Sequence, residues 1–278
     1  MHRHQPYHPI GVFDSGMGGL SVLGCIIDKL PQYDYLYLGD NARTPYGTRS
    51  YEVVYNYTLQ GVNALFDKGC HLVILACNTA SAKALRTIQQ KDLPNLDPGK
   101  RVLGVIRPCT ESIDRYTKNG HVGILATPGT VHSNSYIMEI EKFHPGIRVT
   151  QEACPIWVPL VENKQFDNPG GMYFIRHHIG QLLSSDTSID TMLLACTHYP
   201  ILKEQILSNV PDNVNVLTQG EIVALALSDY LKRHPEIDDK CSKNGYQHFL
   251  TTENPGLFNE KAKIFTDMPV SAAHFEMS

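Results

Sequence analysis

The chain has 278 residues, of which 42% are apolar and 19% are charged, and its formal net charge is −4. This length predicts about two domains with a sizeable core. Lys and Arg form no basic stripe, and no apolar run approaches the roughly 18 residues that cross a bilayer, so we expect neither nucleic acid nor membrane as a partner. The start, "MHRHQPYHP", lacks the apolar core of a signal peptide, and we therefore expect a cytoplasmic protein.

Short apolar strands alternate with helix-length amphipathic segments along the chain, which predicts an α/β fold with mostly parallel sheets. Strands are expected at 9–13, 34–39, 71–76, 101–106, 121–126, 147–153, 191–195 and 213–217. Helices are expected at 51–68, 80–90, 109–117, 130–143, 171–184 and 221–233. The segments "KDLPNLDPGK" and "NVPDNVNV" contain the turn-forming residues of interdomain joints.

Two turns after predicted strands carry candidate binding residues. Asp14 and Ser15 end the first strand, and the glycines that follow would let backbone N–H groups approach an anion. This turn is not a dinucleotide fingerprint, because Ser21 stands where the third glycine would be, and Asp14 equally fits a helix cap. In the next turn, "GDNARTPYGTRS", Tyr46 and Gly47 fit either a carboxylate site or the turn alone.

The seven cysteines are odd in number and none forms a CxxC pair, so we expect free thiols rather than a disulfide framework or a structural zinc site. Most of them have the nondescript surroundings of small buried residues. Two differ, because each ends an apolar run and precedes polar residues: Cys77 with Asn78 and Thr79, and Cys196 with Thr197 and His198. Capping alone would explain either threonine taken singly.

Two such thiols suit the inversion of a stereocentre. A proton must leave one face of a tetrahedral carbon while another arrives on the opposite face, and two flanking bases achieve this in one geometry. Cys has an unperturbed pKa of about 8.5, which a helix start or a cation can lower. His198 fits an acid or base partner for the second thiol, or a solvated loop histidine.

Each half of the chain also runs from a strand into a turn rich in Gly, Ser or Thr, "GVFDSGMGGLS" and "GILATPGTVHS", and later into an Ala-Cys turn. This weak internal repeat suggests two similar lobes. Ligands of parallel sheets bind beyond the carboxyl ends of the strands, so one cysteine from each lobe would face a shared cleft.

The chain resembles the glutamate racemases of the cofactor-independent aspartate/glutamate racemase superfamily. The resemblance covers most of the sequence and rests on "FDSGMGGLSVL", "GDNARTPYG", "ACNTASA", "GVIRP", "ATPGTVHSNSY", "ACTHYPIL" and "FLTTENPGLF". It implies two three-layer α/β domains with the active site between them, the first from 1–99 plus 214–278 and the second from 100–213. It further implies glutamate as substrate, no cofactor and no metal, a homodimer, and D-glutamate for peptidoglycan as the product.

The resemblance also implies a role for each matching residue. Cys77 would take the α-proton from D-glutamate and Cys196 from L-glutamate, with Asp14 and His198 assisting the two thiols. The resemblance also implies which residues bind the substrate amine and carboxylates. These are Asp14 and His198 again, together with Ser15, Tyr46, Gly47, Asn78, Thr79, Thr127, Thr130 and Thr197. The chain departs from the family pattern at Asn41 and Ala195, neither of which is a proposed base.

Other functions remain compatible with the same residues. A racemase could act on aspartate or a hydantoin instead. A thiol hydrolase would use Cys196 as nucleophile and His198 as its base. A non-catalytic amino-acid-binding protein would bind without exchanging the α-proton.

Overall fold

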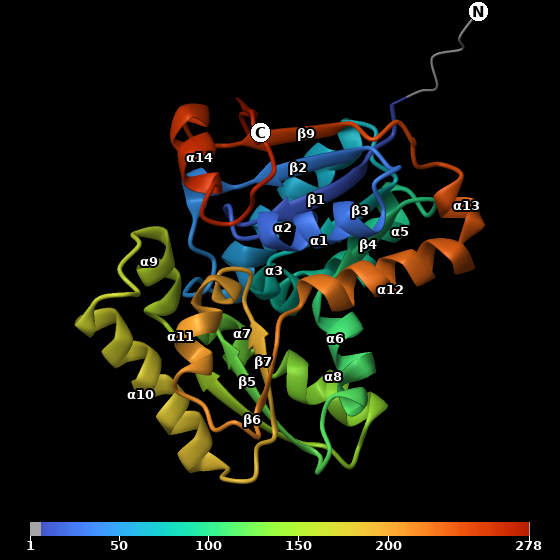
Figure 1. Cartoon of the computed structure of the whole chain (residues 1–278). Helices are drawn as coiled ribbons and strands as arrows, with labels where there is room; N and C mark the ends of the chain where they lie inside the picture. Colours follow the sequence, from blue (N-terminus) through green and yellow to red (C-terminus); the bar gives the residue numbers. More distant parts are fainter. Residues whose placement is uncertain (1–6, 278) are drawn as a thin grey trace, which may run out of the picture.

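The computed structural model describes residues 7–277 and contains two parallel sheets with helices packed around them (Figure 1). Residues 1–6 and 278, which include the start of the expected first domain, lie outside the described part. The predicted α/β class with parallel sheets is confirmed.

The first lobe is built on a sheet with strand order β10-β9-β2-β1-β3-β4. Its strands are β1 (Ile10–Asp14), β2 (Tyr35–Gly39), β3 (Leu72–Leu75), β4 (Arg101–Gly104), β9 (Gln247–Thr251) and β10 (Ala272–His274). The second lobe is built on a sheet with order β6-β5-β7-β8. Its strands are β5 (His121–Ala126), β6 (Arg148–Ala153), β7 (Thr191–Ala195) and β8 (Asn215–Leu217).

Helices connect successive strands in both lobes. Those of the first lobe are α1 (Leu20–Lys29), α2 (Tyr51–Asp67), α3 (Asn78–Lys83), α4 (Leu85–Thr87), α5 (Leu93–Leu96), α12 (Gly220–Arg233), α13 (Pro235–Asp238) and α14 (Pro255–Ala262). Those that follow β4 and accompany the second sheet are α6 (Ile106–Ser112), α7 (Pro128–His132), α8 (Ser135–Phe143), α9 (Trp157–Glu162), α10 (Pro169–Ser185) and α11 (Lys203–Leu207). Figure 1 shows α9, α10 and α11 on the left of this sheet and α6 and α8 on its right.

All eight predicted strands are present, but the C-terminal segment adds β9 and β10, which were not expected as strands. Three predicted helices are interrupted. The segment 109–117 is α-helical only to Ser112, the end of α6, and a 3-10 helix, Ile113–Arg115, follows. The segment 130–143 divides into α7 and α8 because Asn134, with φ 54°, adopts left-handed backbone. The segment 80–90 breaks at Ala84, where α3 ends and α4 follows.

Each expected domain boundary lies one strand earlier in the chain than the point at which the chain passes from one sheet to the other. Strand β4 pairs with β3 of the first sheet, although it begins after the boundary at 99. Strand β8 pairs with β7 of the second sheet, although it begins after the boundary at 213. The division into two domains stays a prediction, and the pairing favours joints after Gly104 and after Leu217.

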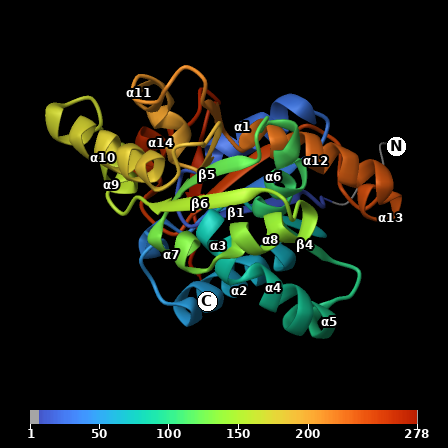
Figure 2. The same cartoon turned by 90° about the horizontal axis from the view of Figure 1, so that it is seen from below.

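The two lobes meet at the carboxyl ends of their central strands. Helix α3, which follows β3, contacts α7 and α6 at this junction. The view from below shows α3 beside α7 (Figure 2). One continuous core joins the lobes, from Ile10 and Tyr37 in the first to Ile124 and Leu193 in the second. The turns after β1, β3, β5 and β7 therefore lie in one region of a shared interior. Among residues 7–277, no helix combines the length and apolarity that a membrane crossing demands.

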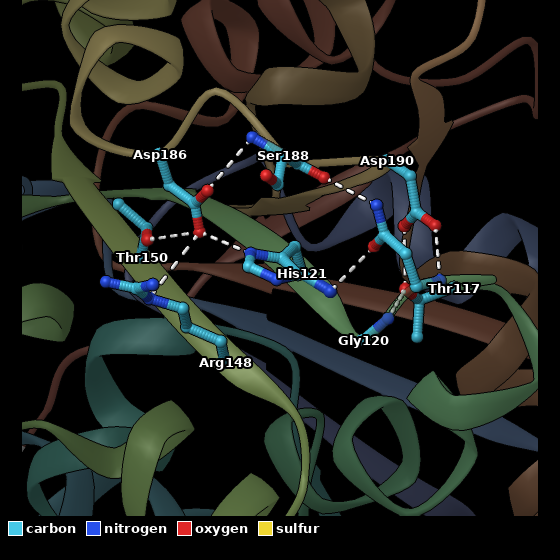
Figure 3. Close-up of polar contacts among 9 residues, drawn as sticks. Thr117, Gly120, His121, Arg148, Thr150, Asp186, Ser188 and Asp190 are labelled. Atoms are coloured by element: carbon cyan, nitrogen blue, oxygen red, sulfur yellow. Dashed lines mark hydrogen bonds and ion pairs between the residues drawn. The ribbon is translucent and has the colours of Figure 1, made fainter.

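The opposite, amino end of the second sheet is held by two aspartates (Figure 3). The Asp186 carboxylate accepts hydrogen bonds from His121 Nδ1 at 2.8 Å and from the Ser188 amide at 3.0 Å, and Arg148 lies 3.8 Å away. Asp190 accepts hydrogen bonds from the Thr117 hydroxyl and from the amides of residues 118 and 119. These contacts fix the loops that enter β5 and β7, far from the junction.

Replacing Asp186 with Asn should lower the free energy of unfolding near neutral pH by about 1 kcal/mol, because hydrogen bonds to a charged carboxylate are weakened. Burial alone would raise the pKa of Asp186, but the His121 and Ser188 hydrogen bonds and the Arg148 charge outweigh it and lower the pKa. A lowered native pKa means that the stabilisation is present above the unfolded value of about 3.9 and is lost as the pH falls through the native pKa. Urea unfolding of the wild type and of Asp186→Asn should therefore show a difference in the free energy of unfolding that becomes smaller as the pH is lowered.

Asp229→Asn is the matched control, because Asp229 pairs with Lys232 where both side chains are more than 70% exposed. Its effect should stay within about 0.5 kcal/mol at every pH. An Asp186→Asn difference that does not depend on pH would contradict the assigned role of the carboxylate.

Candidate active site

Cys77 lies at the junction, directly before α3. Its backbone is extended, its Sγ accepts a hydrogen bond from the Ala80 amide at 3.4 Å, and the side chain is buried. The predicted strand–thiol–helix arrangement is therefore present. Burial and the nearby Asp14 charge raise the pKa of Cys77 to about 11, although the Ser15 side chain and the amides of Ala80 and Thr79 act in the opposite direction.

Cys196 occupies the equivalent place after β7 in the second lobe. It is also buried, and the Tyr199 amide donates to its carbonyl oxygen at 3.1 Å. The segment that follows is a 3-10 helix, Tyr199–Leu202. Burial raises the pKa of Cys196, the His198 amide partly opposes this shift, and negative charge on Cys77 and Asp14 adds to it.

The charge of Cys77 is among the causes that raise the pKa of Cys196, which puts the two thiols, one from each lobe, within electrostatic reach. Packing brings the lobes together at the same point. A Cβ atom on Gly18 of the first lobe would lie 2.3 Å from Thr197 Oγ1 and 2.5 Å from His198 Nδ1. Only glycine fits there, so the turn after β1 lies directly against the turn after Cys196.

Asp14 is fully buried at the end of β1. Its Oδ2 accepts a hydrogen bond from the Gly16 amide at 3.0 Å, whereas its Oδ1 is buried without a partner among residues 7–277. Burial raises the pKa of Asp14, although His198 and the amides of Gly19 and Gly16 act in the opposite direction. A buried carboxylate oxygen without a partner is costly, and a cationic group would satisfy it.

His198 is also buried and is oriented by a residue that sequence analysis missed. Its Nε2 lies 3.1 Å from Glu162 Oε1, at the end of α9, and its ring packs edge-on against Phe265. Its Nδ1 faces Thr197 Oγ1 at 3.4 Å. Glu162 belongs to no recognisable motif in the sequence, so only the folded chain identifies it.

Three buried threonine hydroxyls meet across the lobes. Thr79 Oγ1 lies 2.9 Å from Thr127 Oγ1 and 3.4 Å from Thr130 Oγ1, and the last two are 3.1 Å apart. Thr79 comes from the first lobe, whereas Thr127 caps α7 and Thr130 lies in the same helix, directly after β5. The structure thus brings together three predicted residues that are far apart in sequence.

The remaining predicted residues lie at the same junction with other partners. The Gly129 amide donates to the Gly47 carbonyl at 2.7 Å, which joins the loop after β2 to α7. The Tyr46 hydroxyl donates to the buried carboxylate of Asp40. Asn78 makes side-chain hydrogen bonds to Tyr136 and Gln219. A cavity of about 50 Å³ lies beside Cys196, between α1 and the start of α12.

Comparison with known proteins agrees with this arrangement. The family model described as Asp/Glu/Hydantoin racemase matches residues 20–226. A glutamate racemase of Geobacter metallireducens is 38% identical over 254 residues, which cover 91% of this chain and 90% of that protein. The chain belongs to the Asp/Glu/Hydantoin racemase family.

Solved structures of this racemase family have the same fold. A glutamate racemase isoform from Bacillus anthracis superimposes with a TM-score of 0.88 at 31% identity and 99% coverage of both chains. A glutamate racemase from Francisella tularensis, solved in complex with D-glutamate, gives a TM-score of 0.85 at 29% identity, covering 97% of this chain and 98% of that one.

The raised pKa of Cys77 predicts a distinctive pH profile for its alkylation. Because only the thiolate reacts, the rate of modification by iodoacetamide should keep climbing above pH 9 in the native protein, toward a midpoint near a pKa of about 11. The same peptide in urea should titrate near the unperturbed value of about 8.5. Mass spectrometry of the Cys77 peptide measures both rates, and a native plateau at or below the unfolded midpoint would contradict the effect of burial.

Proposed function

We propose that the protein is a glutamate racemase that interconverts L-glutamate and D-glutamate by proton transfer between two cysteines. The observation that carries this proposal is the placement of two buried thiols, one from each lobe, at the same junction. Relatives that match over about nine-tenths of the chain are named glutamate racemases. No step of the proposed reaction requires a cofactor.

In this reaction Cys77 removes the α-proton from D-glutamate and Cys196 removes it from L-glutamate. In each direction the other thiol then donates its proton to the opposite face of the α-carbon, which inverts the stereocentre. The raised pKa values suit the task, because a more basic thiolate is a stronger acceptor for the weakly acidic α-proton. The positive charge of the substrate ammonium would favour the thiolate form once the substrate is bound.

Asp14 would bind the substrate ammonium, because its Oδ1 is buried without a partner in the described part of the chain. His198 would assist Cys196 through its backbone amide, which lowers the pKa of the thiol, while its ring, held by Glu162 and Thr197, would act on the site electrostatically rather than by a direct hydrogen bond to the sulfur. Burial has removed both side chains from water, and electrostatic contacts are stronger in the protein interior than in water. They would stabilise the charge that develops while the α-carbon is deprotonated.

The substrate carboxylates would be bound by hydroxyl and amide donors rather than by an Arg or Lys side chain. The candidates are Ser15, Tyr46, Gly47, Asn78, Thr79, Thr127, Thr130 and Thr197. The hydroxyls of Thr79, Thr127 and Thr130 bond to one another in the ligand-free structure and could turn to donate to a carboxylate.

A thiol hydrolase receives less support from the same geometry. That reaction needs a histidine nitrogen bonded to the nucleophilic sulfur. Instead, His198 Nε2 faces Glu162 and its Nδ1 faces Thr197. Aspartate remains the alternative substrate, and assays with each amino acid separate the two.

We also propose that the enzyme acts in the cytoplasm as a homodimer and supplies D-glutamate for peptidoglycan. These proposals rest on the resemblance to the glutamate racemases. Sedimentation velocity of the purified protein tests the dimer directly.

Cys77→Ser and Cys196→Ser should each reduce racemisation of glutamate at least about a hundredfold, because a serine hydroxyl is far too weak a base for the step. Circular dichroism of the reaction mixture measures turnover from either enantiomer. Cys70→Ala is the matched control, because Cys70 is a fully buried thiol at the other end of the strand that leads to Cys77. It should keep turnover within about threefold of wild type, even if it lowers stability. Wild-type turnover in either serine variant would refute the two-base reaction.

A further inference from the structure

Three buried side chains form a closed ring of hydrogen bonds next to Cys77. Asn78 Nδ2 donates to Gln219 Oε1 at 2.6 Å, Gln219 Nε2 donates to the Tyr136 hydroxyl at 2.7 Å, and that hydroxyl donates to Asn78 Oδ1 at 2.7 Å. The exposed fractions are 2% for Asn78, 3% for Gln219 and 0% for Tyr136. Each donor in the ring therefore meets an acceptor without any need for water.

The members of the ring come from three separate parts of the fold. Asn78 is the first residue of α3 in the first lobe, and Tyr136 lies on α8 of the second. Gln219 lies at the joint where the chain returns from β8 to α12. The ring therefore links both lobes and the returning joint at the residue that follows Cys77.

The ring fixes the orientation of the Asn78 amide. An Asn side chain has two N–H donors and one carbonyl oxygen, and the ring uses one donor and the oxygen. The second N–H remains for another acceptor. Because every ring member is buried, turning the amide over would leave unpaired groups away from water, which is costly.

We propose that Tyr136 and Gln219 are positioning residues that hold Asn78, and through it Cys77, in the geometry needed for proton transfer. The activity part of this inference rests on the proposed racemase function. Neither residue was a candidate from sequence, and neither needs to touch the substrate. Loss of the ring would let the start of α3 shift relative to the second lobe, and small shifts of a reacting group reduce turnover strongly.

Tyr136→Phe is the principal test, because it removes one oxygen atom and breaks two of the three links. We expect kcat for glutamate to fall about tenfold, with a smaller change in KM, since a misplaced base affects the chemical step more than binding. The ratio of the alkylation rates of Cys77 and Cys196, measured on their peptides by mass spectrometry, should shift at least about threefold from the wild-type ratio.

Tyr35→Phe is the matched control. Tyr35 is equally buried, and its hydroxyl donates to the Leu30 carbonyl at 2.7 Å, away from the thiols. Both variants lose a buried tyrosine hydroxyl, so their urea midpoints should fall by similar amounts. Only Tyr136→Phe should change kcat and the alkylation ratio.

A second variant keeps the test decisive if Tyr136→Phe fails to fold. Gln219→Met retains most of the side-chain volume and removes both hydrogen bonds that Gln219 makes in the ring, so it should also lower kcat and shift the alkylation ratio. Identical kcat values and alkylation ratios in the wild type, the ring variants and Tyr35→Phe would overturn the inference. Absence of racemisation in the wild type would instead refute the proposed function, while the alkylation ratio would still test the ring.

Discussion

The burial of two thiols, one from each lobe, at the carboxyl ends of parallel strands is the constraint on which the proposed chemistry depends. Each sulfur is fixed by its own lobe, because Cys77 follows β3 and Cys196 follows β7. The distance between them is therefore set by how the lobes pack. The contacts at Gly18, the threonine hydroxyls and the ring around Asn78 all lie on that packing surface.

Burial has two opposing effects on such a site. It raises the pKa of both thiols, so the ligand-free protein holds them protonated at neutral pH. It also strengthens every electrostatic contact that a bound substrate would make. The described part of the site places no positive charge next to either sulfur. The ammonium group of the substrate, bound beside Asp14, would supply that charge. Proton transfer would therefore begin only after the substrate binds.

Much of this organisation could be predicted from sequence, for physical reasons. The central strands are continuous apolar runs because both faces of a parallel sheet are covered, so the α/β class was predicted correctly. The Ala-Cys turns were visible because polar residues follow each run abruptly. Strands β9 and β10 were missed, because "QHFLT" and "AAH" are short and partly exposed segments without that apolar signal. Glu162 and Gln219 lie in no quoted motif, and Tyr136 ends the segment "ATPGTVHSNSY" without any sign of its role, since the importance of all three comes from contacts between segments far apart in the chain.

The isotope content of both enantiomers after brief turnover in heavy water tests the central claim most directly. With two bases on opposite faces, the newly formed enantiomer should carry deuterium at the α-carbon while the unreacted substrate keeps its protium, starting from either L-glutamate or D-glutamate. Retention of the original α-proton in the product would indicate a single base that carries the proton from one face to the other, and would contradict the account.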